Sequence, residues 1–227
     1  MLKVSVIIPV LNEEVAVVAA IKSARSAGAD EIFVVDGGST DNTFAVATAH
    51  AGVIVAPSPG RSAQQNIGAD HATGDVLLFL HADCCLNSGA IVELKNRMVS
   101  DSNIVAGCFR QRIDEPGLAF RCLEAGNHSR AAVLKWAYGD QAIFVRADTF
   151  QEIGGFPAMK FMEDLFLMKI LKRRGRIVVL NSPLLVSARR WKRRGVFLQT
   201  LRNWCLIAAA QMGVSPDRLA RFYPNDR

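Results

Sequence analysis

The sequence lacks several features that would place it in common classes of protein. Its five cysteines are an odd number, and none of them forms a Cys-x-x-Cys pair. This pattern argues against a disulfide framework and a zinc finger, so we expect reduced thiols. The longest apolar run near the C-terminus, residues 204–210, is far shorter than the ~20 residues that span a bilayer. The N-terminus has no signal-peptide pattern, so we expect a cytoplasmic protein.

Two common nucleotide-binding signatures are also missing. No Gly-x-Gly-x-x-Gly follows the first strand-like run, and no Gly-x-x-x-x-Gly-Lys-Ser/Thr occurs anywhere. Their absence disfavours a dehydrogenase and a P-loop kinase. We find no internal repeat, low-complexity segment or linker either. The 227 residues, half of them hydrophobic, therefore fit a single domain with a full core.

The charge is basic and unevenly distributed. The net charge is +6 and the pI about 9.3, which favours anionic partners such as nucleotides, phospholipid headgroups or nucleic acid. The basic run at residues 189–194 has three interpretations: a solvated charge run, diphosphate binding by Arg190, or contact with an anionic membrane. It matches no known recognition motif, so we expect no nucleic-acid partner. Phe197, Leu201 and Trp204 share helical spacing, which favours a core or homodimer contact over lipid.

Strand-like and helix-like segments alternate along the chain. We expect strands at 4–8, 31–35, 53–56, 76–80, 104–113, 142–145 and 177–180. We expect helices at 13–27, 39–51, 63–72, 88–99, 118–133, 148–153, 161–174 and 195–212. The regular alternation in the first half is typical of βαβ units. The pattern predicts an α/β fold with a Rossmann-like, mostly parallel central sheet and helices on both faces.

Polar side chains follow the predicted strands where each one ends, and ligands of open α/β sheets bind at that edge. Asp36 follows the second strand, as a ligand contact or as part of a structural turn. Asp83 follows the apolar fourth strand, and a carboxylate there suits Mg²⁺ or Mn²⁺. His81 fits a metal or phosphate contact and, equally, a structural hydrogen bond.

Several motifs in one order resemble the family 2 glycosyltransferases, which have the GT-A fold. The runs that carry the resemblance are VSVIIPVLNEE, VVDGGSTDNT, GRSAQQNIGA, LLFLHAD, GDQAIFV, GGFP and MEDLFL. They extend from about Val4 to Trp191, and the match looks closest to the small stand-alone bacterial members. The resemblance implies a nucleotide-binding half at 1–100, an acceptor and catalytic half at 101–191, and a C-terminal helical extension at 192–227.

The resemblance also implies a role for each matched position. The donor-side residues are Pro9, Leu11 and Glu13 at the nucleobase and ribose, Asp36 at the base, Arg61 at the base or diphosphate, and Asn66 in support of the Arg61 loop. The remaining substrate-binding positions are Ala82, Glu163, Gly139 and Gln141 near the sugar or acceptor, and Arg190 and Trp191 on the diphosphate or acceptor side. Asp83, with His81 as a second candidate, would bind the metal. Asp164 would be the general base, and Asp140 competes for that role.

Two departures from the family pattern affect these expectations. The usual Asp-x-Asp is His81-Ala82-Asp83 here, so one carboxylate remains for the metal. Ser187 stands where processive synthases have the Gln of Gln-x-x-Arg-Trp, which favours a single sugar transfer. We also expect the N-terminus of the helix that follows Asp164 to favour its ionised form. The alternative is that Glu163 and Asp164 have no catalytic role and only occupy the first helical turn.

We therefore predict an inverting glycosyltransferase with a UDP- or GDP-linked sugar donor, Mg²⁺ or Mn²⁺, and an acceptor that the sequence does not identify. One alternative is a sugar-phosphate nucleotidyltransferase, although the loop PVLNEE lacks the Gly-rich signature of that class. The other is a nucleotide-sugar binding module without catalysis. Peripheral contact with the inner face of the membrane and a homodimer are further expectations from the basic and apolar C-terminal segment.

Overall fold

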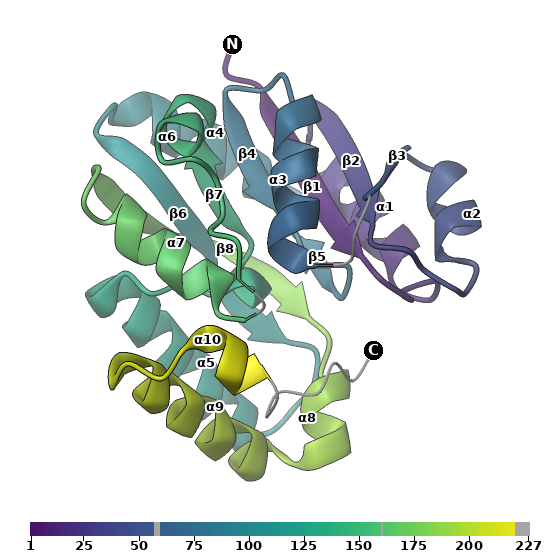
Figure 1. Cartoon of the computed structure of the whole chain (residues 1–227). Coiled ribbons are helices and arrows are strands. Elements are labelled where there is room, and N and C mark those ends of the chain that lie inside the picture. The colour runs from purple at the N-terminus through teal and green to yellow at the C-terminus, as the bar shows by residue number, and fades with distance from the viewer. Residues whose placement is uncertain (57–59, 160, 221–227) are drawn as a thin grey trace.

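A single mixed sheet organises the chain (Figure 1). The computed structural model describes residues 1–56, 60–159 and 161–220, and within them the strands are ordered β3-β2-β1-β4-β7-β6-β8-β5. The strands are β1 Val4–Val10, β2 Glu31–Asp36, β3 Gly52–Val55, β4 Val76–Phe79, β5 Cys84–Leu86, β6 Ile104–Ile113, β7 Ile143–Arg146 and β8 Arg176–Val186.

The predicted parallel half of the sheet is confirmed. β1 pairs in parallel with both β2 and β4, and β2 pairs in parallel with β3. In the second half β6 and β8 are parallel, whereas β7 is antiparallel to β4 and β6, and β5 is antiparallel to β8. The carboxyl ends of β1, β2 and β4 therefore meet at one edge, where α/β sheets place their ligands.

Helices cover both faces of the sheet. They are α1 Val17–Ser26, α2 Thr43–Thr48, α3 Arg61–His71, α4 Ala90–Ser100, α5 Leu118–Ser129, α6 Ala147–Glu152, α7 Glu163–Leu171, α8 Arg189–Arg194, α9 Val196–Gln211 and α10 Pro216–Ala220, with a π-helix at Arg130–Leu134 and a 3-10 turn at Gly139–Gln141. Because side chains alternate along a strand, Ile8 packs with α1 and α4 on one face and Ile7 with α6 and α7 on the other.

Helix α3 lies unusually close to β1 because Gly68 has no side chain. A Cβ at Gly68 would overlap Cγ2 of Ile7 and lie 3.0 Å from Cγ2 of Val35. Interiors packed this tightly do not absorb an added methyl without a shift of the backbone. The close approach fixes α3 on the sheet and brings Arg61, its first residue, to the edge where the parallel strands end.

Three features differ from the expectations. β8 continues from the predicted strand to Val186, and Glu93 accepts hydrogen bonds from the amides of Asn181 and Ser182 at 2.9 and 2.8 Å. The three-residue β5 was missed because only its pairing with β8 defines it. The basic run forms the short helix α8, which Gly195, at φ 78°, separates from α9. No helix among the described residues is long and apolar enough to cross a membrane.

Candidate functional site

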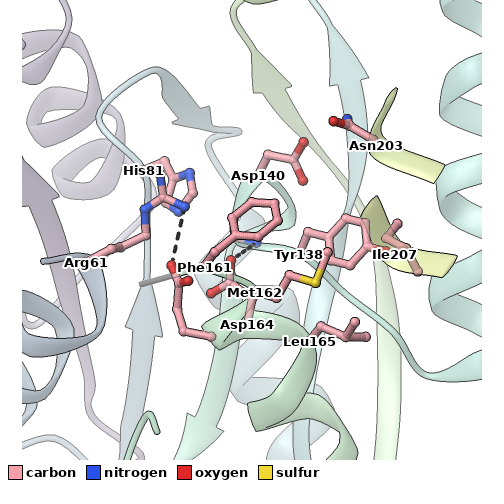
Figure 2. Close-up of a pocket in the computed structure, with 12 residues that line it drawn as sticks. Arg61, His81, Tyr138, Asp140, Phe161, Met162, Asp164, Leu165, Asn203 and Ile207 are labelled. Atoms are coloured by element: carbon pink, nitrogen blue, oxygen red, sulfur yellow. Dashed lines mark hydrogen bonds and ion pairs between the residues drawn. The ribbon is translucent and has the colours of Figure 1, made fainter. Parts of the chain in front are cut away.

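A pocket of about 120 Å³ lies between the start of α3, the start of α7 and the middle of α9 (Figure 2). We call it the Asp164 pocket. The residues that line it are Arg61, His81, Tyr138, Gly139, Asp140, Phe161, Met162, Glu163, Asp164, Leu165, Asn203 and Ile207. The pocket thus brings together six of the residues that the sequence predicted: Arg61, His81, Gly139, Asp140, Glu163 and Asp164.

Asp164 is a buried carboxylate with one oxygen held by a hydrogen bond and the other left without one. Its Oδ2 accepts a hydrogen bond from the Gly139 amide at 2.8 Å, and its buried Oδ1 has no hydrogen-bond partner among the described residues. Burial, and secondly the neighbouring Glu163 carboxylate, raise the pKa of Asp164 to about 7, against the opposing effects of Arg61 and the Gly139 amide. The expected preference of the helix N-terminus for the ionised form is therefore outweighed by desolvation.

Glu163 and Arg61 form an ion pair across the pocket. Nη1 of Arg61 lies 3.3 Å from Oε1 of Glu163, whose side chain is 4% exposed against 29% for Arg61. The dashed line on the Arg61 side of Figure 2 marks this contact, which joins α3 to α7. A buried carboxylate requires such compensation. The pair also places a guanidinium, a natural partner for phosphate, beside Asp164.

Gly139 is where His81 and Asp164 meet. A Cβ at Gly139 would overlap Nε2 of the His81 ring and lie 2.8 Å from Oδ2 of Asp164. The ring of His81, which is 8% exposed, therefore packs against this glycine and faces the Asp164 pocket. Asp83 does not line this pocket.

Asp140 is held by a chain of side-chain hydrogen bonds. Nε2 of Gln111 donates to Oδ2 of Asp140 at 3.1 Å, and Oε1 of Gln111 accepts from Asn127 at 2.6 Å. Arg130 in turn donates to Asn127 and to Oε1 of Gln141, both at 2.8 Å. Oδ1 of Asp140 is buried without a partner in the described part of the chain. Oε1 of Gln141 is thus part of this network, whereas Nε2 of Gln141, like Oδ1 of Asp140, is left without a partner among the described residues.

The two segments that carry these carboxylates are bordered by strained backbone. Ala142, after the Gly139–Gln141 turn, has φ 47°, and Met162, before α7, has φ 65°. Non-glycine residues rarely adopt this left-handed conformation, and it persists where the surroundings enforce it, often at functional sites. The strain indicates that Asp140 and Asp164 are set in place by the fold before any ligand arrives.

The donor-side residues predicted at the nucleobase and ribose, Pro9, Leu11, Glu13 and Asp36, lie at the ends of β1 and β2 and do not line the Asp164 pocket. Oδ1 of Asp36 accepts hydrogen bonds from the amides of Gly38 and Ser39 at 3.1 and 2.9 Å. Asp36 thus stabilises the turn after β2, which is the structural role that the sequence offered as an alternative to ligand contact. Glu13 pairs with Arg189 at 2.9 Å, so its carboxylate faces α8. Pro9 is buried in β1 and Leu11 is half-buried just after it.

The other predicted positions have structural partners of their own. Asn66 bonds the backbone of Phe156 in both directions, at 3.0 and 2.8 Å, and so ties α3 to the loop before α7. Ala82 is 6% exposed, and Trp191 is 7% exposed and packs in the larger core cluster. The side chains of Arg190, Phe197 and Leu201 lie outside the part of the chain that the structure describes.

Asp83 offers one carboxylate to a metal. It is half-buried after β4, its Oδ1 lies 3.6 Å from Sγ of Cys84, and its carbonyl accepts from the Ser187 amide at 3.0 Å. Among the described residues no group of three or more His, Cys, Asp or Glu side chains could hold a metal ion. Mg²⁺ commonly binds through one or two carboxylates with substrate phosphates completing its shell. Asp83 therefore fits a metal that arrives with a diphosphate and does not form a complete site alone.

Six residues of the pocket were missed by the sequence analysis. They are Tyr138, Phe161, Met162, Leu165, Asn203 and Ile207. The first four are neighbours of predicted site residues, so their closeness along the chain was the available signal. Asn203 and Ile207 are four residues apart on one face of α9. Nothing local indicates that this face reaches a pocket formed some 40 to 140 residues earlier.

Comparison with known sequences places these features in a family. The model of the family "Glycosyl transferase family 2" matches residues 5–162. Relatives include uncharacterized glycosyltransferases of Mycobacterium tuberculosis and Mycobacterium bovis, each 35% identical over 108 residues. The match covers 46% of this chain and 47% of each relative, so it spans about half of the relatives' length.

Solved structures share the fold at low sequence identity. The crystal structure of S. aureus TarS 1–349 has a TM-score of 0.65 at 16% identity, over 96% of this chain and 68% of that one. TarS 1–349 in complex with UDP-GlcNAc matches with a TM-score of 0.65 at 18% identity, over 82% and 58%. Glucosyl-3-phosphoglycerate synthase from Mycobacterium tuberculosis, in complex with Mn²⁺, UDP-glucose and phosphoglyceric acid, matches with 0.60 at 22%, over 80% and 70%. These likenesses confirm the GT-A fold that the sequence predicted.

Proposed function

Because this chain belongs to glycosyl transferase family 2, we propose that it transfers one sugar from a nucleotide-diphosphate sugar to an acceptor hydroxyl, with inversion at the anomeric carbon. The observation that carries the proposal is the unused Oδ1 of Asp164, a buried carboxylate whose pKa is raised to about 7. A general base is most effective when its pKa lies near the working pH. The UDP-sugars in the structures of TarS and of the synthase support UDP as the nucleotide.

Asp164 acts as the base in this proposal. Its Oδ1 takes the proton of the acceptor hydroxyl while the hydroxyl oxygen bonds to the anomeric carbon. The bond from that carbon to the diphosphate oxygen breaks on the opposite face, which inverts the configuration. The Gly139 amide holds Oδ2 at 2.8 Å and so fixes which oxygen receives the proton. Base assistance of this kind contributes ~10²–10⁴-fold to the rate.

Arg61 and Asp83 serve the leaving diphosphate. Arg61, held at the pocket by Glu163, supplies a guanidinium that is 29% exposed and can meet phosphate oxygens. Asp83 is the residue that would hold Mg²⁺ or Mn²⁺, and the Mn²⁺ in the structure of the synthase supports a divalent ion. When bound, the ion would neutralise charge on the departing diphosphate. Pro9, Leu11, Glu13 and Asp36, at the ends of β1 and β2, form the proposed nucleoside side.

The test compares two variants of the pocket carboxylates. Asp164→Asn keeps the shape and the hydrogen bond to Gly139 but accepts no proton, so turnover should fall by ~10²-fold or more with little change in donor affinity. UDP-glucose, UDP-GlcNAc and GDP-mannose, each with Mn²⁺, serve as donors, and both transfer and donor hydrolysis are recorded. Asp70→Asn, at an exposed position of α3, is the matched control.

The outcomes separate the rival assignments. Loss of turnover in Asp140→Asn with normal turnover in Asp164→Asn would move the base to Asp140, whose Oδ1 is also buried and unpartnered in the described structure. Donor binding without transfer or hydrolysis in the parent protein would favour a binding module. Release of a sugar 1-phosphate together with the nucleoside triphosphate, when pyrophosphate is added to the donor, would favour a nucleotidyltransferase.

A further inference from the structure

The side of the Asp164 pocket toward α9 is mostly apolar, with the Asn203 amide and the buried Tyr138 hydroxyl as its polar groups. Ile207 of α9 and Leu165 of α7 lie on the side opposite Arg61 and His81, with the Tyr138 ring beside them (Figure 2). The polar atoms that a reacting hydroxyl needs, those of Asp140 and Asp164, lie nearer the centre of the view. The pocket therefore presents a reactive polar end and an apolar flank, and a ligand that fills it must match both.

The carboxyl groups of the pocket disfavour an anionic acceptor. Asp140, Glu163 and Asp164 contribute three carboxyl groups, and Arg61 is the guanidinium among the described lining residues. That guanidinium is already shared with Glu163. An anionic group on the acceptor would meet the carboxyl groups of Asp140 and Asp164 in a partly desolvated space, and it would compete with Glu163 and the donor diphosphate for Arg61.

The apolar flank comes partly from outside the region that the family model matches. That match ends at residue 162, whereas Asn203 and Ile207 lie on α9. Their spacing of four puts them on one face of the helix. Trp204, the next residue after Asn203, is 67% exposed and does not line the pocket. One face of α9 is thus directed at the pocket, and the neighbouring face is left to solvent.

We propose that the acceptor is an uncharged hydroxyl compound joined to an apolar group, and that Ile207 selects it by contact with that apolar group. The inference rests on the proposed function, because the acceptor hydroxyl must reach Asp164. Specificity then comes from α9, while the chemistry stays with α7 and the Gly139 turn.

The test uses three probes that share one sugar: n-octyl β-D-glucoside below its micelle concentration, glucose, and glucose 6-phosphate. Their dissociation constants are measured by titration calorimetry with UDP and Mn²⁺ present. Octyl glucoside should bind at least ~10-fold more tightly than glucose, since burial of two methylene groups already supplies that factor. Glucose 6-phosphate should bind more weakly than glucose. Tighter binding of glucose 6-phosphate than of octyl glucoside would overturn the proposal.

Variants of α9 locate the effect. Ile207→Asp should weaken octyl glucoside at least ~10-fold by adding a charge to the apolar flank, and Ile207→Leu should retain its affinity. Trp204→Ala, on the same helix outside the pocket, should have no effect. If Ile207→Asp does not fold, Ile207→Ala should still weaken octyl glucoside more than glucose. Equal effects at positions 207 and 204 would contradict the proposal.

Donor binding keeps this test apart from the proposed function. UDP affinity should be unchanged in every α9 variant, because none of the substituted residues lies at the ends of β1 and β2. An octyl glucoside preference that depends on Ile207, with no sugar transferred from UDP-glucose, UDP-GlcNAc or GDP-mannose, would support the acceptor class and contradict the glycosyl transfer. Transfer to glucose 6-phosphate in preference to octyl glucoside would support the glycosyl transfer and contradict the acceptor class.

Discussion

Asp164 is held against the backbone of Gly139. Oδ2 of Asp164 accepts a hydrogen bond from the Gly139 amide at 2.8 Å, and a Cβ added to Gly139 would lie 2.8 Å from the same oxygen. On its other side the added atom would overlap the His81 ring. The absence of a side chain at Gly139 therefore allows a histidine and a buried aspartate, from segments distant in sequence, to approach one turn.

The first prediction concerns that contact. Gly139→Ala should displace Asp164, His81 or both, and turnover should fall by up to ~10²-fold, since misplacement of a reacting group by about 1 Å can cost that much. UDP affinity should change less, because the proposed nucleoside side lies at other strand ends. Steady-state kinetics and UDP titration measure the two effects.

The control for Gly139→Ala is Gly126→Ala. Gly126 is exposed on α5, and a Cβ there meets nothing within 4 Å. In a helix this change should stabilise the protein by ~0.5–1 kcal/mol and leave turnover as it is. Full activity in Gly139→Ala would mean that the Asp164 contact has no part in catalysis.

The sequence predicts the strands that position the site better than it predicts the residues that line the pocket. The four parallel strands follow from apolar runs separated by helical patterns, so the edge that holds Arg61 and His81 is predictable. Asp140 and Asp164 are found through family motifs. Ile207 is not, because the packing of α9 against the pocket depends on tertiary contacts that no local pattern records. The same limit applies to the pKa of Asp164, which the helix N-terminus should lower and which burial raises instead.

The second prediction is that ionisation of Asp164 makes the stability of the protein depend on pH. Burial raises the pKa of Asp164 in the folded protein to about 7, from an ordinary value of 3.8. Between these values the folded protein keeps a proton that the unfolded chain has lost, so stability falls as the pH rises and the full cost is reached above pH 7. Asp164→Asn removes this cost. The variant should therefore gain stability over the parent, and the gain should grow from pH 5 to pH 8.

Urea unfolding of the two proteins at pH 5, 6, 7 and 8 measures that gain. Asp70→Asn, with an exposed side chain, should show no growing difference. A constant difference between Asp164→Asn and the parent across this range would mean that Asp164 ionises in the folded protein as readily as in the unfolded chain.

The third prediction concerns the metal. Asp83 stands without a preformed group of ligands among the described residues, so the protein alone should bind Mn²⁺ weakly. The donor diphosphate would complete the shell of the ion. Mn²⁺ should then tighten UDP binding by ~5–150-fold, the usual range of coupling between two ligands, and UDP should tighten Mn²⁺ binding by the same factor. Titration calorimetry with each ligand in the presence and absence of the other measures both.

Asp83→Ala should abolish this coupling and leave the metal-free affinity for UDP in place. Asp70→Ala, at an exposed site on α3, is the control and should keep the coupling. His81→Asn distinguishes the second candidate ligand. Because the His81 ring packs against Gly139 and lines the Asp164 pocket, this variant should lose turnover while UDP and Mn²⁺ still bind cooperatively. If Mn²⁺ changes neither the UDP affinity nor the GDP affinity of the parent protein, the metal role of Asp83 is refuted. Loss of coupling in His81→Asn would show that His81 is a metal ligand.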